Sequence, residues 1–380
     1  MIRIAEITGI LIFIALLIPS CNSNNQNKII TGESSGPTAS IQPSLQSSSF
    51  DFATLYQHVR PSVVSVKSDT LNGVNIGTGF VFDAEGYIVT SYHVVQTEAN
   101  LEVKFSSGEI VPASLVGKDE ISDLAVLKLD YPPAELVPLI LGSSEKVIVG
   151  ETVAAFGNPF GLEGTITTGI VSGAKQGLRY FREILGSEGD LMGEIIVTDA
   201  TINPGNSGGP LVNTTGEGIG IIRNIVTAGG KNQPAGIAFA LPADIAKPII
   251  ESLVEQGTFA YPDLGFSAAD QFTLEEIESL GLPVEDGIYI TEVEPRGPAE
   301  EAGLIAGYNK SSRVGITPGG DVILAVDNKK LENYDQLMAY LIKNKKPGDV
   351  IQFTVLRGGE KLTIPLTIGI KEDTSSDDWQ

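Results

Sequence analysis

A chain of 380 residues is long enough for two or three domains, each with a hydrophobic core of its own. Its 47 acidic residues outnumber the 25 basic ones, and a net charge of −22 repels phosphate backbones, which argues against nucleic acid as a partner. One cysteine and two histidines exclude an internal disulfide and leave too few ligands for a zinc site of the usual kind.

The first residues have the features of an export signal. Arg3 precedes an apolar run, residues 7–18, which as a helix would span about 18 Å against roughly 30 Å of bilayer hydrocarbon. That length is typical of a signal-peptide core rather than of a membrane span. Cys21 follows a small residue, as in bacterial lipoprotein signals, which predicts a signal peptide over residues 1–20 and lipidation of Cys21. An uncleaved anchor and ordinary secretion are the alternatives, and all three export the bulk of the chain.

Residues 21–50 are rich in Ser, Asn, Gln, Gly and Pro without apolar periodicity, which predicts a flexible tether. From Asp51 onward, short β-branched runs alternate with turn residues, a pattern that favours an antiparallel barrel or sandwich. The expected strands cover residues 61–67, 79–82, 87–90, 101–105, 124–129, 152–156, 169–172, 194–198, 218–222 and 236–240. The first clear helix is expected over residues 243–255, because isoleucines recur there at helical spacing and Gly257 follows as a stop.

A second block, residues 257–371, mixes strand and helix patterns and predicts a smaller α+β domain. Its strands are expected near residues 287–293, 321–326 and 350–356, and its helices at 299–302 and 334–344. The acidic residues 372–380 are expected to form a disordered tail.

The sharpest chemical signal is the loop at residues 205–210, with the sequence GNSGGP. Glycines on both sides of Ser207 allow a tight turn that exposes its hydroxyl. They also leave backbone N–H groups free to converge on one point, which the oxyanion of an acyl-transfer reaction requires. The alternative is a glycine turn in which Ser207 merely faces water.

Two other residues fit the needs of a serine nucleophile. His93 lies at the end of an expected strand, and Asp123 directly precedes a strongly apolar strand, where a desolvated carboxylate needs a partner such as an imidazolium. Taken singly, they fit a structural histidine and a turn-capping aspartate equally well. Together with Ser207 they follow the chain order His, Asp, Ser of the chymotrypsin class. His58 lies in a helical pattern without a glycine turn and is expected at the surface.

Residues 51–371 resemble the HtrA/Deg family, in which a trypsin-like serine protease domain precedes a PDZ domain. The matching segments occur in the family's order and cover residues 77–81, 86–95, 122–128, 157–161, 168–172, 199–211 and 236–242. The resemblance implies a mostly β chain, with a chymotrypsin-like double antiparallel β-barrel over residues 51–256 and a smaller α+β PDZ domain over residues 257–371.

The resemblance also implies residue roles. By position, Ser207 is the nucleophile, His93 the general base and then acid, and Asp123 the residue that orients His93. The backbone N–H groups of Gly205 and Ser207 would form the oxyanion hole. Asn206 stands where digestive relatives carry an aspartate that pairs with a new N-terminus, so activation by zymogen cleavage is not expected.

Substrate selection is expected to depend on a small apolar S1 pocket. Thr201 stands six residues before Ser207, where trypsin-like enzymes place the aspartate that selects Lys or Arg. A neutral residue at that position, with Ile222 and Ile225 near it in sequence, predicts cleavage after Val, Ile, Ala or Leu.

Residues 261–266, with the sequence YPDLGF, resemble the carboxylate-binding loop of PDZ domains. In that loop the N–H groups of Leu264, Gly265 and Phe266 would bind a C-terminal carboxylate while the peptide adds as a strand.

The resemblance implies an ATP-independent serine endopeptidase that degrades or processes unfolded or damaged exported proteins. Its PDZ domain would bind C-terminal peptides, and the chain would form a homotrimer or a larger assembly held at the membrane of the cell envelope, on its periplasmic or outer face. No P-loop is present, and neither a cofactor nor a metal is expected. The alternatives are a membrane-tethered chaperone or scaffold with an idle triad, and a regulatory protease with a narrow set of substrates.

Overall fold

The structure is a computed structural model that describes residues 50–371 apart from several internal gaps. The gaps are residues 71–72, 98, 159–163, 178–192, 228–233, 271, 273–276, 278–286 and 308–318. The predicted signal peptide, the lipidation site Cys21, the tether before Phe50 and the acidic tail therefore lie outside the described residues. Within the described part of the chain, no helix combines the length and the apolar character needed to cross a bilayer.

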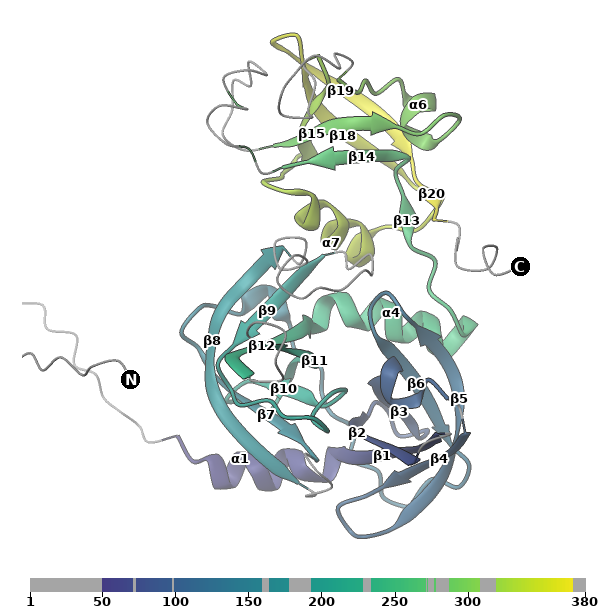
Figure 1. Ribbon diagram of the computed structural model, residues 1–380, viewed down its shortest axis with the longest axis vertical. Helices are drawn as coiled ribbons and strands as arrows, with labels where there is room; N and C mark the ends of the chain where they lie inside the picture. Colours follow the sequence, from purple (N-terminus) through teal and green to yellow (C-terminus); the bar gives the residue numbers. More distant parts are fainter. Residues whose placement is uncertain are drawn as a thin grey trace, which may run out of the picture. The chain divides into compact units, whose positions relative to one another are not determined.

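Six antiparallel strands close into a first barrel, in the order β1-β2-β3-β6-β5-β4 (Figure 1). They are β1 (Val63–Thr70), β2 (Gly73–Val81), β3 (Tyr87–Ser91), β4 (Ala99–Lys104), β5 (Ile110–Asp119) and β6 (Leu124–Leu129). Side chains on alternate faces of a strand point inward, and apolar residues at those positions fill the barrel. Val66, Ile88 and Leu127 have no exposed surface.

A second closed barrel follows, with the strand order β10-β11-β12-β9-β8-β7. Its strands are β7 (Thr152–Gly157), β8 (Thr165–Gly177), β9 (Glu194–Thr198), β10 (Pro210–Val212), β11 (Gly218–Thr227) and β12 (Pro234–Pro242). Leu211 and Ile222 are fully buried inside it. The predicted double antiparallel barrel is thereby confirmed.

In the described part of the chain, helices α1 (Phe52–Val59), the four-residue α2 (Tyr92–Val95) and α4 (Ala243–Gln256) accompany the barrels, and the longest of them packs on both. Ile249 of α4 joins a core cluster with Phe80 of the first barrel and Phe156 of the second. The helix ends at Gly257 in a left-handed conformation (φ +79°), as its sequence predicts.

The remaining residues form a smaller α+β unit around one mixed core. Its strands are β13 (Pro262–Asp263), β14 (Phe266–Ala269), β15 (Ile288–Val293), β16 (Val322–Val326), β17 (Lys329–Lys330), β18 (Val350–Arg357), β19 (Glu360–Thr367) and β20 (Gly369–Ile370), and its helices are α6 (Pro298–Ala302) and α7 (Tyr334–Asn344). The main sheet runs β14-β15-β16-β18-β19 with β14 at one edge. Ile290, Leu337 and Phe353 are fully buried between this sheet and α7.

Candidate active site

The imidazole of His93 is held by the carboxylate of Asp123. His93 Nδ1 lies 3.0 Å from Oδ1 and 2.9 Å from Oδ2 of Asp123, and the backbone N–H of His93 donates to Oδ1 at 3.0 Å. Since a carboxylate only accepts, Nδ1 carries the proton and Nε2 is left as the base. The His93 side chain is 48% exposed and that of Asp123 only 15%, so the base faces solvent while its partner is sheltered.

The sequence context predicts that His93 lies at the end of a strand. In the structure it is instead the second residue of the short helix α2. β3 ends at Ser91, and the chain turns at once into this single helical turn. The backbone of Asp123 stabilises the turn, because Tyr92 N–H donates to the Asp123 carbonyl at 3.0 Å. Asp123 itself has φ +58°, a left-handed conformation that is uncommon outside glycine and that aims its carboxylate at α2.

The predicted nucleophile loop, residues 205–210, is a tight turn stabilised by its own backbone. Asn206 N–H donates to the Asn203 carbonyl at 3.0 Å, and Gly209 N–H donates to the Asn206 carbonyl at 2.9 Å. Gly208 has φ +83°, and a Cβ there would lie 2.3 Å from the Thr78 carbonyl and 2.6 Å from Ser91 N. Glycine is therefore required at position 208, and its close contact brings the loop carrying Ser207 against the β3–α2 junction that carries His93.

Thr78, on β2 of the first barrel, fixes the peptide planes of this loop. Its backbone N–H donates to the Ser207 carbonyl at 3.0 Å, and its hydroxyl donates to the Gly205 carbonyl at 2.5 Å. The same hydroxyl accepts from Asn158 N–H at 2.9 Å. Among the described residues, the N–H groups of Gly205 and Ser207 donate to no acceptor, as the predicted oxyanion hole requires.

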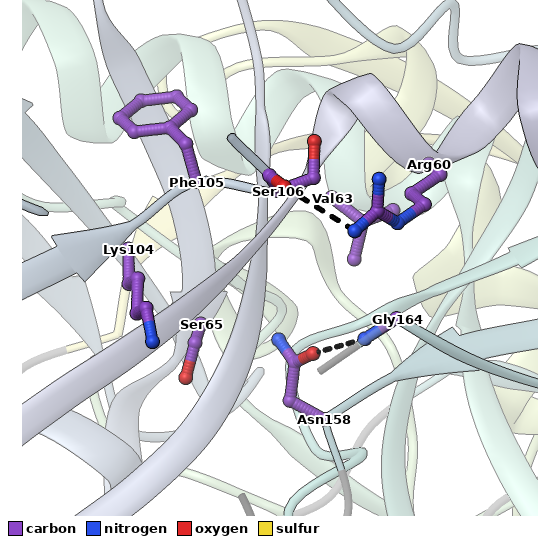
Figure 2. Close-up of a pocket in the computed structure, with 8 residues that line it drawn as sticks. All are labelled: Arg60, Val63, Ser65, Lys104, Phe105, Ser106, Asn158 and Gly164. Atoms are coloured by element: carbon purple, nitrogen blue, oxygen red, sulfur yellow. Dashed lines mark hydrogen bonds between the residues drawn. The ribbon is translucent and has the colours of Figure 1, made fainter. Parts of the chain in front are cut away.

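A small cavity lies next to Asn158 and is lined mostly by residues of the first barrel and the segments beside it. Figure 2 shows Asn158 beside Gly164, whose N–H donates to Asn158 Oδ1 at 2.7 Å, and Arg60, whose guanidinium donates to the Ser106 carbonyl at 3.2 Å. The cavity volume is about 10 Å³, room for roughly one water molecule. It is too small for a peptide.

Replacing Thr78 by valine is expected to lower kcat by about 10- to 100-fold with a smaller change in KM. Valine keeps the shape and the backbone N–H, but the Gly205 carbonyl loses its donor and Asn158 N–H its acceptor. The loop can then rotate its peptide planes away from the oxyanion. Steady-state kinetics on a peptide substrate measure the loss. Thr78→Ser, which keeps the hydroxyl, should retain most of the activity, and an inactive Thr78→Ser would contradict this explanation.

Asn206 occupies a site that suits a neutral side chain. It is 1% exposed, and its Oδ1 has no hydrogen-bond partner among the described residues. A Cβ added to Gly157 would lie 2.4 Å from that oxygen, so the amide packs directly against the backbone of β7. A carboxylate at this buried position would need a compensating cation, which the neutral Asn206 does not.

The three S1 candidates occupy different environments. Thr201 is exposed, and its carbonyl accepts from the Thr167 hydroxyl at 2.8 Å. The Ile222 side chain is fully buried in the core of the second barrel, and its backbone bonds the nucleophile loop. Ile225 lies in β11 opposite Ala238, and its side chain lies outside the described residues. Of the two candidates whose side chains are described, Thr201 is the one open to a substrate.

In the smaller unit, the predicted carboxylate loop already binds one carboxylate. Gly265, with φ +66°, donates its N–H to Oδ1 of Asp263 at 3.0 Å. Leu264 and Phe266 on either side are buried in the core, and Phe266 begins the edge strand β14. The loop therefore directs at least one N–H toward an anionic oxygen beside a strand edge where a peptide can add.

Two other expectations concern residues away from this site. His58 is exposed on α1, as its sequence context predicts. Over the described ranges, no cluster of three or more His, Cys, Asp or Glu side chains could hold a metal ion.

Comparisons with known proteins agree with this geometry. A family model described as a trypsin-like peptidase domain matches residues 77–221, and a PDZ domain model matches residues 262–368. Protease Do-like 1, chloroplastic, of Arabidopsis thaliana is 36% identical over 343 residues, which cover 87% of this chain and 74% of that protein. Serine protease Do-like HtrA of Bacillus subtilis (strain 168) is 36% identical over 314 residues, covering 79% and 65%.

A third relative, named a probable periplasmic serine endoprotease DegP-like, comes from Halomonas elongata. It is 36% identical over 295 residues, covering 78% of this chain and 56% of its own length. The chain thus spans 56–74% of the length of these three relatives.

Solved structures give the same result. The HtrA-type protease AlgW with a tripeptide has a TM-score of 0.68 and 32% identity, covering 85% of this chain and 98% of that one. The serine endoprotease from Yersinia pestis has a TM-score of 0.58 and 30% identity, with the same coverage.

Proposed function

The chain belongs to the Do-like, HtrA-type family of serine endopeptidases, and we propose that it hydrolyses unfolded or damaged exported proteins without ATP. The observation that supports this most strongly is the bidentate pairing of His93 with Asp123 beside the glycine loop of Ser207, where two backbone N–H groups are free. A chaperone with an idle triad would have no need for either arrangement.

The proposed reaction follows the geometry. His93 Nε2 takes the proton of the Ser207 hydroxyl as its oxygen attacks the scissile carbonyl, and Asp123 stabilises the imidazolium that forms. The N–H groups of Gly205 and Ser207 bind the resulting oxyanion. His93 returns the proton to the leaving amine, and a water molecule then hydrolyses the acyl-enzyme by the same steps.

The smaller unit is proposed to bind C-terminal peptides of the substrates. A C-terminal carboxylate would replace Asp263 at the Gly265 N–H while the peptide pairs with the edge of β14. We place the boundary between the protease domain (51–256) and the PDZ domain (257–371) at Gly257, where α4 ends. HtrA-type proteases have been solved with a tripeptide and with a decapeptide, which supports peptides as ligands of this chain.

The cellular setting is proposed from the sequence and the relatives. One relative is named periplasmic and another chloroplastic, which supports action outside the cytoplasm. Lipidation at Cys21 would hold the enzyme at the membrane, and assembly as a homotrimer or a larger oligomer follows the family resemblance.

Cleavage profiling with a peptide library tests the proposal and the S1 prediction together. The full chain is expected to cleave after Val, Ile, Ala or Leu, because a neutral, exposed Thr201 offers no charge for Lys or Arg. Added C-terminal peptides are expected to raise the rate. Equal or better cleavage after Arg would contradict the apolar S1 pocket. A wild-type chain no more active than Ser207→Ala across all peptides would favour the chaperone.

A further inference from the structure

We infer that Arg223, from the second barrel, is a positioning residue that braces the turn carrying Asp123 in the first. Its guanidinium Nη2 donates to the carbonyl of Ile121 at 3.1 Å, two residues before Asp123. The inference rests on the proposed triad. It adds a residue outside the triad motifs that holds Asp123 in position.

Arg223 follows directly after the residue that bonds the nucleophile loop. Ile222 accepts from Gly208 N–H at 2.9 Å and donates to the Gly209 carbonyl at 2.8 Å. Two neighbouring residues of β11 therefore contact the serine loop and the aspartate turn, and a shift of this strand would misplace both.

The other end of the aspartate turn is also fixed by a distant residue. The Tyr261 hydroxyl donates to Oδ2 of Asp119 at 2.6 Å, and Ser122 N–H donates to the same oxygen at 2.9 Å. Tyr261 is 5% exposed, and its burial, together with the charge of Asp119, raises the pKa of the phenol well above its usual value. Tyr261 thus stays neutral and keeps its proton as a donor to Asp119.

Arg223 supplies the positive charge that this turn needs. Asp119 is 9% exposed and the Asp123 side chain 15%, so two sheltered carboxylates lie four residues apart in the chain. Burial lowers the pKa of the Arg223 guanidinium, and the negative charges of Asp123 and Asp119 oppose that shift, so the group remains a cation. Removing it would leave both carboxylates without this counter-charge and the Ile121 carbonyl without its donor.

The conformation of Asp123 explains why such a brace matters. A left-handed φ of +58° in a non-glycine residue persists only when its surroundings enforce it. Arg223 acts on the segment that sets this angle, and Asp123 in turn sets the tautomer and orientation of His93. Thr78, on the first barrel, holds the Ser207 loop of the second barrel in the same way. Each barrel therefore positions a proposed catalytic residue of the other.

The test compares Arg223→Met and Arg223→Lys with a matched control, Arg60→Met, in the full chain. Arg60 also donates from its guanidinium to a loop carbonyl, that of Ser106, but at the cavity rather than at the triad. The readouts are kcat and KM on one peptide, and the downfield proton resonance of the hydrogen bond between His93 Nδ1 and Asp123.

Arg223→Met is expected to lower kcat by about 10- to 100-fold with little change in KM, and to shift or broaden the downfield resonance. Arg223→Lys keeps the charge and should recover part of the loss. Arg60→Met should leave kcat and the resonance unchanged. A folded Arg223→Met with wild-type kcat and an unchanged resonance would overturn the inference.

If Arg223→Met does not fold, the kcat and the downfield resonance of Arg223→Lys test the inference instead. A displaced resonance with reduced kcat supports the brace, and a wild-type resonance with wild-type kcat contradicts it. An inactive wild-type chain that nevertheless shows the resonance, displaced in the Arg223 variants, would reject the proposed function while supporting the brace.

Discussion

Ser207→Ala is expected to lower kcat on the order of 10⁶-fold while leaving the fold unchanged. In the proposed reaction this hydroxyl forms the acyl-enzyme, and within the described residues it makes no hydrogen bond whose loss would destabilise the loop. The remaining rate would come from the oxyanion donors and from substrate binding. Steady-state kinetics on the best peptide from the library, with circular dichroism to verify folding, measure the effect.

Ser91→Ala is the matched control for this substitution. Ser91 is buried next to the same loop, and its Oγ has no partner among the described residues. Its activity should stay within about tenfold of the wild type, since no triad hydrogen bond involves it. A Ser207→Ala enzyme with activity comparable to Ser91→Ala would reject Ser207 as the nucleophile.

Asp123→Asn is expected to lower kcat about 10⁴-fold at neutral pH. Asparagine has nearly the same shape, but its NH₂ group donates where the carboxylate accepts from His93 Nδ1. His93 would then carry its proton on Nε2, where it cannot take the proton of Ser207. The loss should appear in kcat and not in thermal stability, because the new amide still pairs with the imidazole.

Asp130→Asn provides the comparison for that prediction. Asp130 is an exposed aspartate just after β6 that accepts from the Ser114 hydroxyl at 3.2 Å. Its amide variant should keep wild-type kcat. An Asp123→Asn enzyme that also kept wild-type kcat would show that Asp123 does not set the His93 tautomer.

The elements that could be predicted from the sequence are those whose local residue pattern is regular and uninterrupted. The β-branched run at residues 87–90 became β3 (Tyr87–Ser91), and the expected helix at 334–344 became α7 with the same bounds. β5 (Ile110–Asp119) was missed because Pro112 and Gly117 interrupt its pattern and its burial does not alternate cleanly. β10 is only three residues long, too short for any period to appear.

Some residues of the candidate site could be predicted from the sequence, and others could not. His93, Asp123 and Ser207 could be proposed from sequence because the three together follow the chain order of the chymotrypsin class and lie in segments that match the family. Thr78 and Arg223 could not, because their contacts join residues 127 and 102 positions apart and depend on how two barrels pack. The only local signal for Thr78 was its place between two glycines, a pattern that fits many turns. These contacts of Thr78 and Arg223 form only when the two barrels pack together, so no single segment of the sequence indicates them.

The most direct measurement of the central claim is to react the full chain with a fluorophosphonate and map the adduct by mass spectrometry. Such reagents phosphonylate an activated serine and need the base and the oxyanion donors that the site provides. One adduct per chain on Ser207 is predicted, with its formation strongly slowed in Asp123→Asn. No adduct on a folded wild-type chain, or an adduct on another serine that persists in Ser207→Ala, would contradict the account.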